Sequence, residues 1–229
     1  MEMDLDYTIQ RSLKRQKLTI SVERDRRVVV HAPANLSDEK IRQVIESRRL
    51  WIYEKIGHPQ KYSNLPHPPG KELVSGESAL YLGRQYRIEV VKNGLSGIEF
   101  AQRFLIPDMK KENKVEALRK WYISRSKEKI TPRVKSHAHA LGVDIAAIKI
   151  IDSRYRWGSC TLKNNINLNW RLIKAPMFVI DYVIVHEIAH LFEPNHTSQF
   201  WNIIQAQTPT MEKAKAWLKE NGQLLEQDV

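Results

Sequence analysis

The sequence contains a single cysteine, Cys160, and no apolar run long enough to cross a bilayer. One cysteine excludes an intrachain disulfide and fits a reducing compartment. The most apolar stretches, such as Phe178–Val185, are far shorter than the roughly 20 residues that a membrane helix needs. The acidic start, Met1 to Asp6, lacks the basic segment and the apolar stretch of a secretory signal. These absences predict a cytoplasmic protein that does not span a membrane.

Acidic residues are in the minority, with 26 Asp and Glu against 37 Lys and Arg, so the formal net charge is +11. A chain this basic can attract nucleic acid, nucleotides or acidic surfaces. The same excess can also serve only to keep a protein soluble. Nucleic acid is therefore a candidate partner that composition alone does not establish.

The N-terminal part of the chain is predicted to form mainly β-strands. Short segments rich in Ile, Val and aromatic residues predict strands at Tyr7–Arg11, Lys17–Glu23, Arg27–Ala32, Ala79–Leu82, Gln85–Val91 and Ile98–Ile106. Ser37 has the position of a helix N-cap, and an apolar stripe predicts one amphipathic helix from there to Gly57. The proline-rich segment His58–Gly76 is expected to be a loop or linker.

The C-terminal part carries most of the predicted helices. Helical patterns cover Val115–Leu141, interrupted or kinked near Pro132, then Pro176–Phe192, a segment from about Thr197, and Met211–Asn221. Strands are expected at Ala147–Ile151 and Asn165–Trp170. Because strands and helices do not alternate regularly, we predict the α+β class. Pro107 and the charged segment Asp108–Glu112 suggest a β-rich N-terminal domain of residues 1–108 and a second domain of residues 109–229.

The sharpest motif is His186-Glu-Ile-Ala-His190, inside the second domain. Histidines four positions apart lie on one face of a helix, so both rings can reach one metal ion. Zinc held by three ligands keeps a position for water and lowers the pKa of that water to about 7, so Glu187 can act as general base. The alternative is that the two histidines and the glutamate form a polar stripe that faces the solvent. However, the surrounding helix is strongly apolar, and burying these groups without a partner would be costly.

The third ligand should follow the helix. His196 stands at the distance that metzincins use, but Glu193 replaces their glycine and no Met-turn is evident, so we reject membership of that group. We expect His196 to be the third ligand; two alternatives stay open, that Glu193 is the ligand or that His196 is only a surface cap. The remaining histidines are expected at the surface or in loops: His31, His58, His67, His137 and His139.

Four segments in this order strongly resemble the YgjP-like metallopeptidases, zincin-fold relatives of the SprT/Spartan-like proteins. They are Arg156–Thr161, Asn167–Ile173, Asp181–Leu191 and Asn195–Trp201, and looser likeness extends over nearly the whole chain. The resemblance implies a small zincin-like domain in which His186, His190 and His196 hold zinc and Glu187 is catalytic. It also implies that Trp157–Thr161 lies on or beside the sheet strand nearest the active site.

Other residues in these segments have less certain roles. A thiolate can bind zinc, but we expect Cys160 to be a small buried residue, because three histidines suffice for a catalytic site. Trp157 and Trp170 are expected in the core or the cleft wall. Candidates for binding an oxyanion or a phosphate are Arg154, Arg156 and Arg171, each of which can equally be a charge on the sheet surface.

Zinc-dependent hydrolysis of peptide bonds, with a peptide or protein as substrate, is therefore the predicted function. A nucleotide pyrophosphatase is the first alternative, since the same activated water attacks phosphoanhydrides and a basic chain favours anions. A protease recruited to DNA, as in the SprT-like relatives, is the second. A purely structural zinc protein is the third.

Overall fold

The computed structural model describes residues 5–23, 26–58, 71–92, 94–153 and 156–226. Within these ranges the chain forms six α-helices and three β-sheets, which confirms the predicted α+β class. No helix in the same ranges has the length and apolar character needed to cross a membrane. Most of the predicted linker, residues 59–70, lies outside the described residues, as do His67 and Arg154.

The chain divides into two compact units: unit 1 is Met1–Pro66 with Arg154–Arg156, and unit 2 is His67–Ser153 with Trp157–Val229. This division differs from the predicted boundary between residues 108 and 109. The sheet just before that boundary shares one hydrophobic core with the helix that follows it, through Phe104 and Trp121.

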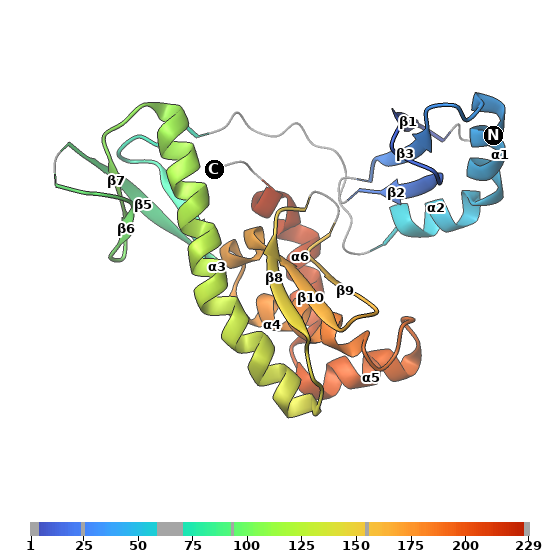
Figure 1. Cartoon of the computed structure of the whole chain (residues 1–229). Coiled ribbons are helices and arrows are strands. Elements are labelled where there is room, and N and C mark those ends of the chain that lie inside the picture. The colour runs from blue at the N-terminus through green and yellow to red at the C-terminus, as the bar shows by residue number, and fades with distance from the viewer. Residues whose placement is uncertain (1–4, 24–25, 59–70, 93, 154–155, 227–229) are drawn as a thin grey trace. The chain divides into compact units, whose positions relative to one another are not determined.

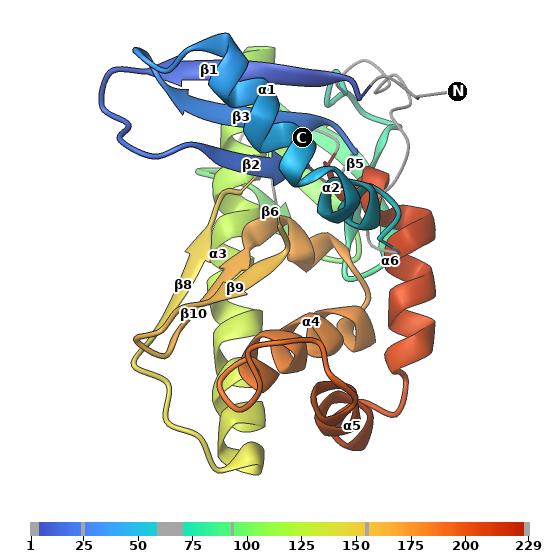
Figure 2. The same ribbon diagram turned by 90° about the vertical axis from the view of Figure 1, so that its right-hand side faces the viewer.

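Unit 1 is a three-stranded sheet with two helices on one face (Figures 1 and 2). Its strands β1 (Tyr7–Ser12), β2 (Thr19–Val22) and β3 (Val28–Pro33) lie in the order β1-β3-β2, with β1 parallel and β2 antiparallel to β3. The helices are α1 (Asp38–Ser47) and α2 (Arg49–Ile56). The core joins alternate strand residues to one helix stripe: Val22, Val28, Val30, Ala32, Ile41, Ile45 and Ile52.

The single helix predicted from Ser37 to Gly57 is wrong in one respect. Ser37 does cap α1, accepting a hydrogen bond from the backbone N–H of Lys40. However, Arg48 leaves helical geometry, with φ −109° and ψ 9°, and separates α1 from α2. The apolar stripe continues across this break through Ile45 and Ile52, so the hydrophobic pattern carries no sign of it.

Unit 2 is organised around the long helix α3 (Lys111–Leu141), drawn in green in Figure 1. On one side lies a four-stranded sheet in the order β4-β5-β7-β6. Its strands are β4 (Ser78–Tyr81), β5 (Arg84–Val91), β6 (Glu99–Phe100) and β7 (Phe104–Pro107). Aromatic side chains join this sheet to α3: the ring centroids of Tyr81 and Trp121 are 5.1 Å apart, and those of Phe104 and Trp121 are 5.0 Å apart.

On its other side α3 packs against a second sheet and the C-terminal helices (Figure 1). This sheet has the order β8-β10-β9, with β10 (Asn165–Asn169) parallel to β8 (Ala147–Ile151) and antiparallel to β9 (Gly158–Cys160). A short 3-10 helix, η1 (Trp170–Lys174), follows β10. The helices α4 (Met177–Ala189), α5 (Ser198–Gln207) and α6 (Met211–Glu226) complete the unit.

Two further predictions for unit 2 need correction. The strand predicted over Ile98–Ile106 is a hairpin of β6 and β7, turned at Gln102, whose φ is +61°. The helix predicted over Val115–Leu141 is not interrupted near Pro132, because α3 continues through that residue; the alternative, a kink there, stays a prediction. Ile130 and Val134, on either side of it, are fully buried, and their packing offsets the cost of about 3 kcal/mol for an internal proline.

Candidate metal centre

Helix α4 carries His186, Glu187 and His190 through the core of unit 2. Pro176 precedes its first residue, and His190 caps its C-terminal end. The helix is apolar on nearly every side, with Val179, Ile184 and Ile188 fully buried, so its axis and rotation are set by packing. Within this buried helix His186 and His190 are only half-buried, and they face the segment that leads to α5.

That segment supplies His196, which brings a third ring to the other two. The side chain of the next residue, Thr197, caps α5 by accepting a hydrogen bond from the backbone N–H of Phe200 at 3.3 Å. The ring centroid of His196 lies 5.0 Å from that of His186 and 5.0 Å from that of His190, while the latter two are 5.1 Å apart. The cap therefore fixes the backbone that follows His196.

These three rings have the geometry of a metal site. One nitrogen of each lies within 4.8 Å of the others, and the Nε2 atoms of His186 and His196 are 3.3 Å apart. Two nitrogens bound to one tetrahedral zinc ion, each at about 2.0–2.1 Å, are separated by about 3.3 Å. Imidazole nitrogens are also donors that zinc commonly takes, so the donor set fits this ion, as does the spacing of the His186–His196 pair.

His190 is oriented by the backbone beyond α4. Its Nδ1 atom lies 3.3 Å from the carbonyl oxygen of Glu193. A carbonyl only accepts, so Nδ1 carries the hydrogen and Nε2 keeps its lone pair for a metal. Burial lowers the pKa of His190, and this effect outweighs the hydrogen bonds to the carbonyls of Glu193 and Pro194, which act in the opposite direction. The ring is therefore neutral at physiological pH, the state that binds metal.

Aromatic side chains surround the histidines. Phe200 is fully buried, and its ring centroid lies 5.0 Å from that of His186 and 4.6 Å from those of His190 and His196. Trp201 lies 5.5 Å from His196 by the same measure. The histidine rings thus pack against apolar side chains, which limit the rotation of the rings and lower the local dielectric.

The side chain of Glu187 lies against strand β9. The residue is buried, with a relative exposure of 8%. A Cβ atom placed on Gly158 would be 2.6 Å from Cγ and 2.7 Å from Oε1 of Glu187, so the carboxylate touches the strand backbone. The segment expected beside the active site, Trp157–Thr161, therefore contains a strand that contacts the predicted general base. Our reading of the sequence assigned no role to Gly158.

Cys160 lies two residues along the same strand and is half-buried rather than fully buried. Burial raises the pKa of its thiol, and the charge of Glu187 raises it further. Among the described His, Cys, Asp and Glu side chains, the group close enough to hold a metal consists of the three histidines, without Cys160 or Glu193. A carboxylate oxygen of Glu193 instead accepts a hydrogen bond from the backbone N–H of Asn195 at 3.4 Å.

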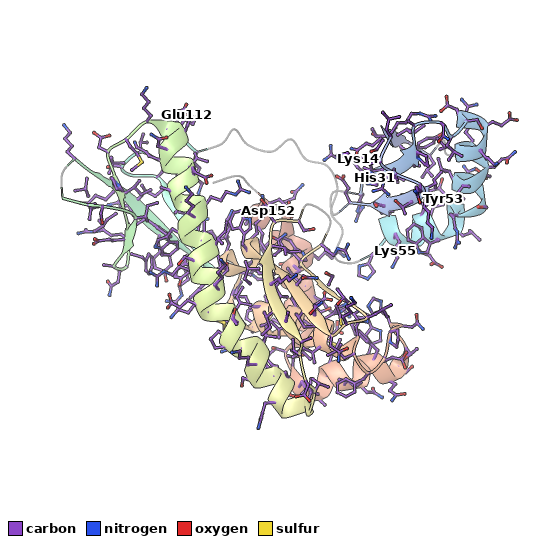
Figure 3. All side chains as sticks on the ribbon, in the orientation of Figure 1. Lys14, His31, Tyr53, Lys55, Glu112 and Asp152 are labelled. Atoms are coloured by element: carbon purple, nitrogen blue, oxygen red, sulfur yellow. The ribbon has the colours of Figure 1, made fainter. Side chains whose placement is uncertain are left out.

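The other predicted residues take structural positions. Trp157 and Trp170 are buried, as expected. Arg171 is also buried, where its guanidinium pairs with Asp152 and stacks 4.5 Å above the Trp170 ring. Asp152 lies at the end of β8 (Figure 3). Burial opposes ionisation of Asp152, but Arg171 and Arg119 together lower its pKa. Arg171 is therefore engaged in an ion pair with this carboxylate. Arg156 is exposed.

His137 was expected at the surface and is instead half-buried, in a contact between α3 and α4. Its Nε2 atom lies 3.3 Å from a carboxylate oxygen of Asp181, and Arg133 forms a two-pronged ion pair with the same group. The spacing of Arg133 and His137, one helical turn apart, was the available signal, but their partner on another helix was not visible in the sequence.

Comparison with known proteins bears directly on this site. The family model described as YgjP-like, metallopeptidase domain, matches residues 16–221, which is most of the chain. The chain belongs to the YgjP-like family. The resemblance noted in the sequence is thereby confirmed, and this YgjP-like domain is a metallopeptidase by family.

Two solved structures are similar to this YgjP-like chain over a smaller part. One is the metallopeptidase zymogen jannalysin of Methanocaldococcus jannaschii, 22% identical with a TM-score of 0.35, covering 42% of this chain and 97% of its own. The other is the metallopeptidase zymogen abylysin of Pyrococcus abyssi, 18% identical with a TM-score of 0.33, covering 37% and 89% respectively. A comparison with curated proteins found no match.

Proposed function

We propose that this chain is a zinc-dependent peptidase in which His186, His190 and His196 hold the metal and Glu187 is the general base. One observation carries the proposal: three imidazole rings converge beside a buried glutamate, with two Nε2 atoms 3.3 Å apart. Membership of a family described as a metallopeptidase domain supports it. Every residue assigned to this site lies in the predicted C-terminal part, residues 109–229.

The bound metal would supply a Lewis acid and a water molecule of lowered pKa. Glu187 then accepts the proton of the attacking water and later delivers it to the leaving amine. Its burial against β9 keeps bulk water from solvating the carboxylate, which strengthens its interaction with the reacting groups. The Phe200 ring, which packs against His190 and His196, keeps these proposed ligands in place during the reaction.

A peptide is the substrate that the surroundings favour. Strand β9 is at the edge of the sheet β8-β10-β9 and packs against α4. An edge strand can bind an extended peptide through main-chain hydrogen bonds, which would place a peptide bond beside Glu187. The rings that contact the histidines belong to Tyr182, Phe200 and Trp201, and the ammonium group of Lys215 lies 4.9 Å from the centroid of the Trp201 ring. Arg171, the buried arginine considered for binding a phosphate, is paired with Asp152.

The test is to measure zinc content and activity together for the wild type, Glu187→Gln and Glu193→Gln. We expect about one zinc per chain in all three, since neither glutamate is a ligand in this proposal. Cleavage of an unstructured protein should fall by about 10²–10⁴-fold in Glu187→Gln and remain in Glu193→Gln. Loss of zinc in Glu193→Gln would instead assign Glu193 as the third ligand.

The same proteins should be tested on nucleoside triphosphates and for binding to duplex DNA. Hydrolysis of nucleotides alone, abolished by Glu187→Gln, would keep the metal centre and replace the substrate class. Binding to DNA that weakens steeply with added salt would favour a protease recruited to nucleic acid. Wild-type protein that binds zinc without any hydrolysis would leave a structural zinc site.

A further inference from the structure

Gly158 is the residue of β9 that touches Glu187. A methyl group at this position would meet three atoms of the glutamate side chain, Cγ at 2.6 Å, Oε1 at 2.7 Å and Cδ at 2.8 Å. Real Cβ atoms essentially never approach other heavy atoms within 3.0 Å. The carboxylate therefore occupies the volume that any other amino acid would fill with its side chain.

The direction of this contact follows from the sheet register. Gly158 pairs with Leu168, and Cys160 pairs with Ile166, across the antiparallel β9–β10 pair. Leu168 and Ile166 are fully buried, and successive side chains alternate between the two faces of a sheet. Position 158 thus faces the buried side of the sheet, where β9 packs against α4.

Backbone conformation does not account for the glycine. The φ angle of Gly158 lies outside the left-handed range, in contrast to Gly83, whose φ is +80°. A residue with a side chain could adopt the Gly158 backbone without strain. Close approach to Glu187 is therefore the reason that the structure provides for glycine at this position.

We propose that Gly158 is a positioning residue for Glu187: the bare backbone of β9 forms the wall against which the carboxylate is held beside the histidines. This inference rests on the proposed role of Glu187 as general base. It makes the edge strand part of the machinery that orients the base. A displacement of about 1 Å in a catalytic group can reduce a rate by about 100-fold.

The first test compares Gly158→Ala with Gly97→Ala. Gly97 belongs to the same unit, has no atom within 4 Å of an added Cβ and lies outside the left-handed range, so its substitution is a matched control. In Gly158→Ala the atoms that collide belong to the flexible glutamate side chain, so the fold and the histidines should persist. We expect about one zinc per chain in both variants, and a kcat for peptide cleavage about 100-fold lower in Gly158→Ala with a similar KM.

Two combined variants separate positioning from general damage. Glu187→Asp shortens the side chain by one methylene, so adding Gly158→Ala should reduce kcat far less in that background than in the wild type. In the Glu187→Gln background, which lacks the base, Gly158→Ala should have almost no further effect on kcat. Equal losses in all three backgrounds, or a loss of zinc in Gly158→Ala, would overturn the proposal.

A measurement without metal or substrate tests the contact itself. In metal-free protein, Gly158→Ala should lower Tm by about 2–4 °C, and this loss should shrink in the Glu187→Ala background, where the colliding atoms are absent. An unchanged loss of Tm in that background contradicts the proposed contact. A wild type that is inactive on peptides would refute the proposed function alone, since the Tm comparison would still report whether Gly158 holds Glu187.

Discussion

Phe200 should control zinc affinity without touching the metal. Its ring contacts all three histidine rings, with centroid distances of 5.0, 4.6 and 4.6 Å, and it is fully buried. Phe200→Leu removes three carbons from this position. At about 0.8 kcal/mol for each buried CH₂, the free energy of unfolding should fall by about 2 kcal/mol. The histidine rings also lose their support, so ordering them around zinc becomes less favourable.

We expect the zinc affinity of Phe200→Leu to be about 10-fold to 100-fold lower than that of the wild type, as for other residues that support metal ligands. The measurement is competition for zinc against a chromophoric chelator, with thermal unfolding of the metal-free protein recorded in parallel.

Phe104→Leu is the matched control for this prediction. Phe104 is also fully buried in the core of unit 2, and its ring contacts are with Tyr81, Phe100, Trp121 and Tyr122. Phe104→Leu should lower Tm by a similar amount and leave zinc affinity unchanged. The reasoning is refuted if both variants lose the same zinc affinity, or if Phe200→Leu loses stability while binding zinc as the wild type does.

Three further outcomes follow from the same geometry. Burial opposes ionisation of Asp181, but His137 and Arg133 together lower its pKa below the unfolded value of about 3.9. The ionised carboxylate therefore stabilises the fold above about pH 3.9, and this stabilisation is lost as the pH falls through the lower folded pKa. Asp181→Asn should therefore lose about 1–2 kcal/mol of unfolding free energy at pH 7, less than a fully buried pair because Arg133 is 39% exposed. In acid denaturation curves the difference from the wild type should vanish once the pH falls below the lowered folded pKa of Asp181. Because burial lowers the pKa of His190, zinc should stay bound below the ordinary imidazole pKa of about 6.5. The measurement is the zinc content of the protein after dialysis at a series of pH values from about 8 to about 5. Complete release of zinc above about pH 6.5 would contradict this expectation. Removing metal with a chelator should lower Tm, and added Zn²⁺ but not Mg²⁺ should restore it, since imidazole donors do not suit magnesium.

The convergence of His186 and His190 could be predicted from the sequence because it depends on local geometry, and their role as ligands stays a prediction. A spacing of four residues places His186 and His190 on one helix face whatever the rest of the chain does. His196 was less secure, since its position depends on the turn at Glu193 and on the cap at Thr197. In the folded chain His196 lies beside the other two rings, and its role as a ligand stays a prediction.

The features that the sequence did not reveal depend on contacts between distant segments. Pro132 remains inside a helix because the neighbouring turns are buried in the core of unit 2. Arg48 breaks a helix without a glycine or proline, and Gln102 makes a turn with a φ of +61° that this residue type seldom adopts. His137 is half-buried beside Asp181, which lies on another helix. Local propensity cannot anticipate the positions of Pro132 and His137, because packing against other segments decides them.

Two of the motifs that carry the family resemblance lie in contact with each other in the folded chain. Trp157-Gly-Ser-Cys160 has no chemistry of its own that explains why glycine should follow tryptophan, and His186-Glu-Ile-Ala-His190 does not indicate what holds its glutamate. The contact between Gly158 and Glu187 answers both questions, because the glycine leaves room for the carboxylate and the strand backbone confines it. Under this proposal, helix α4 with His186 and Glu187 is not sufficient for the reaction. The base needs a wall from a separate part of the chain, so substitutions in the two motifs should combine non-additively although the motifs are distant in sequence.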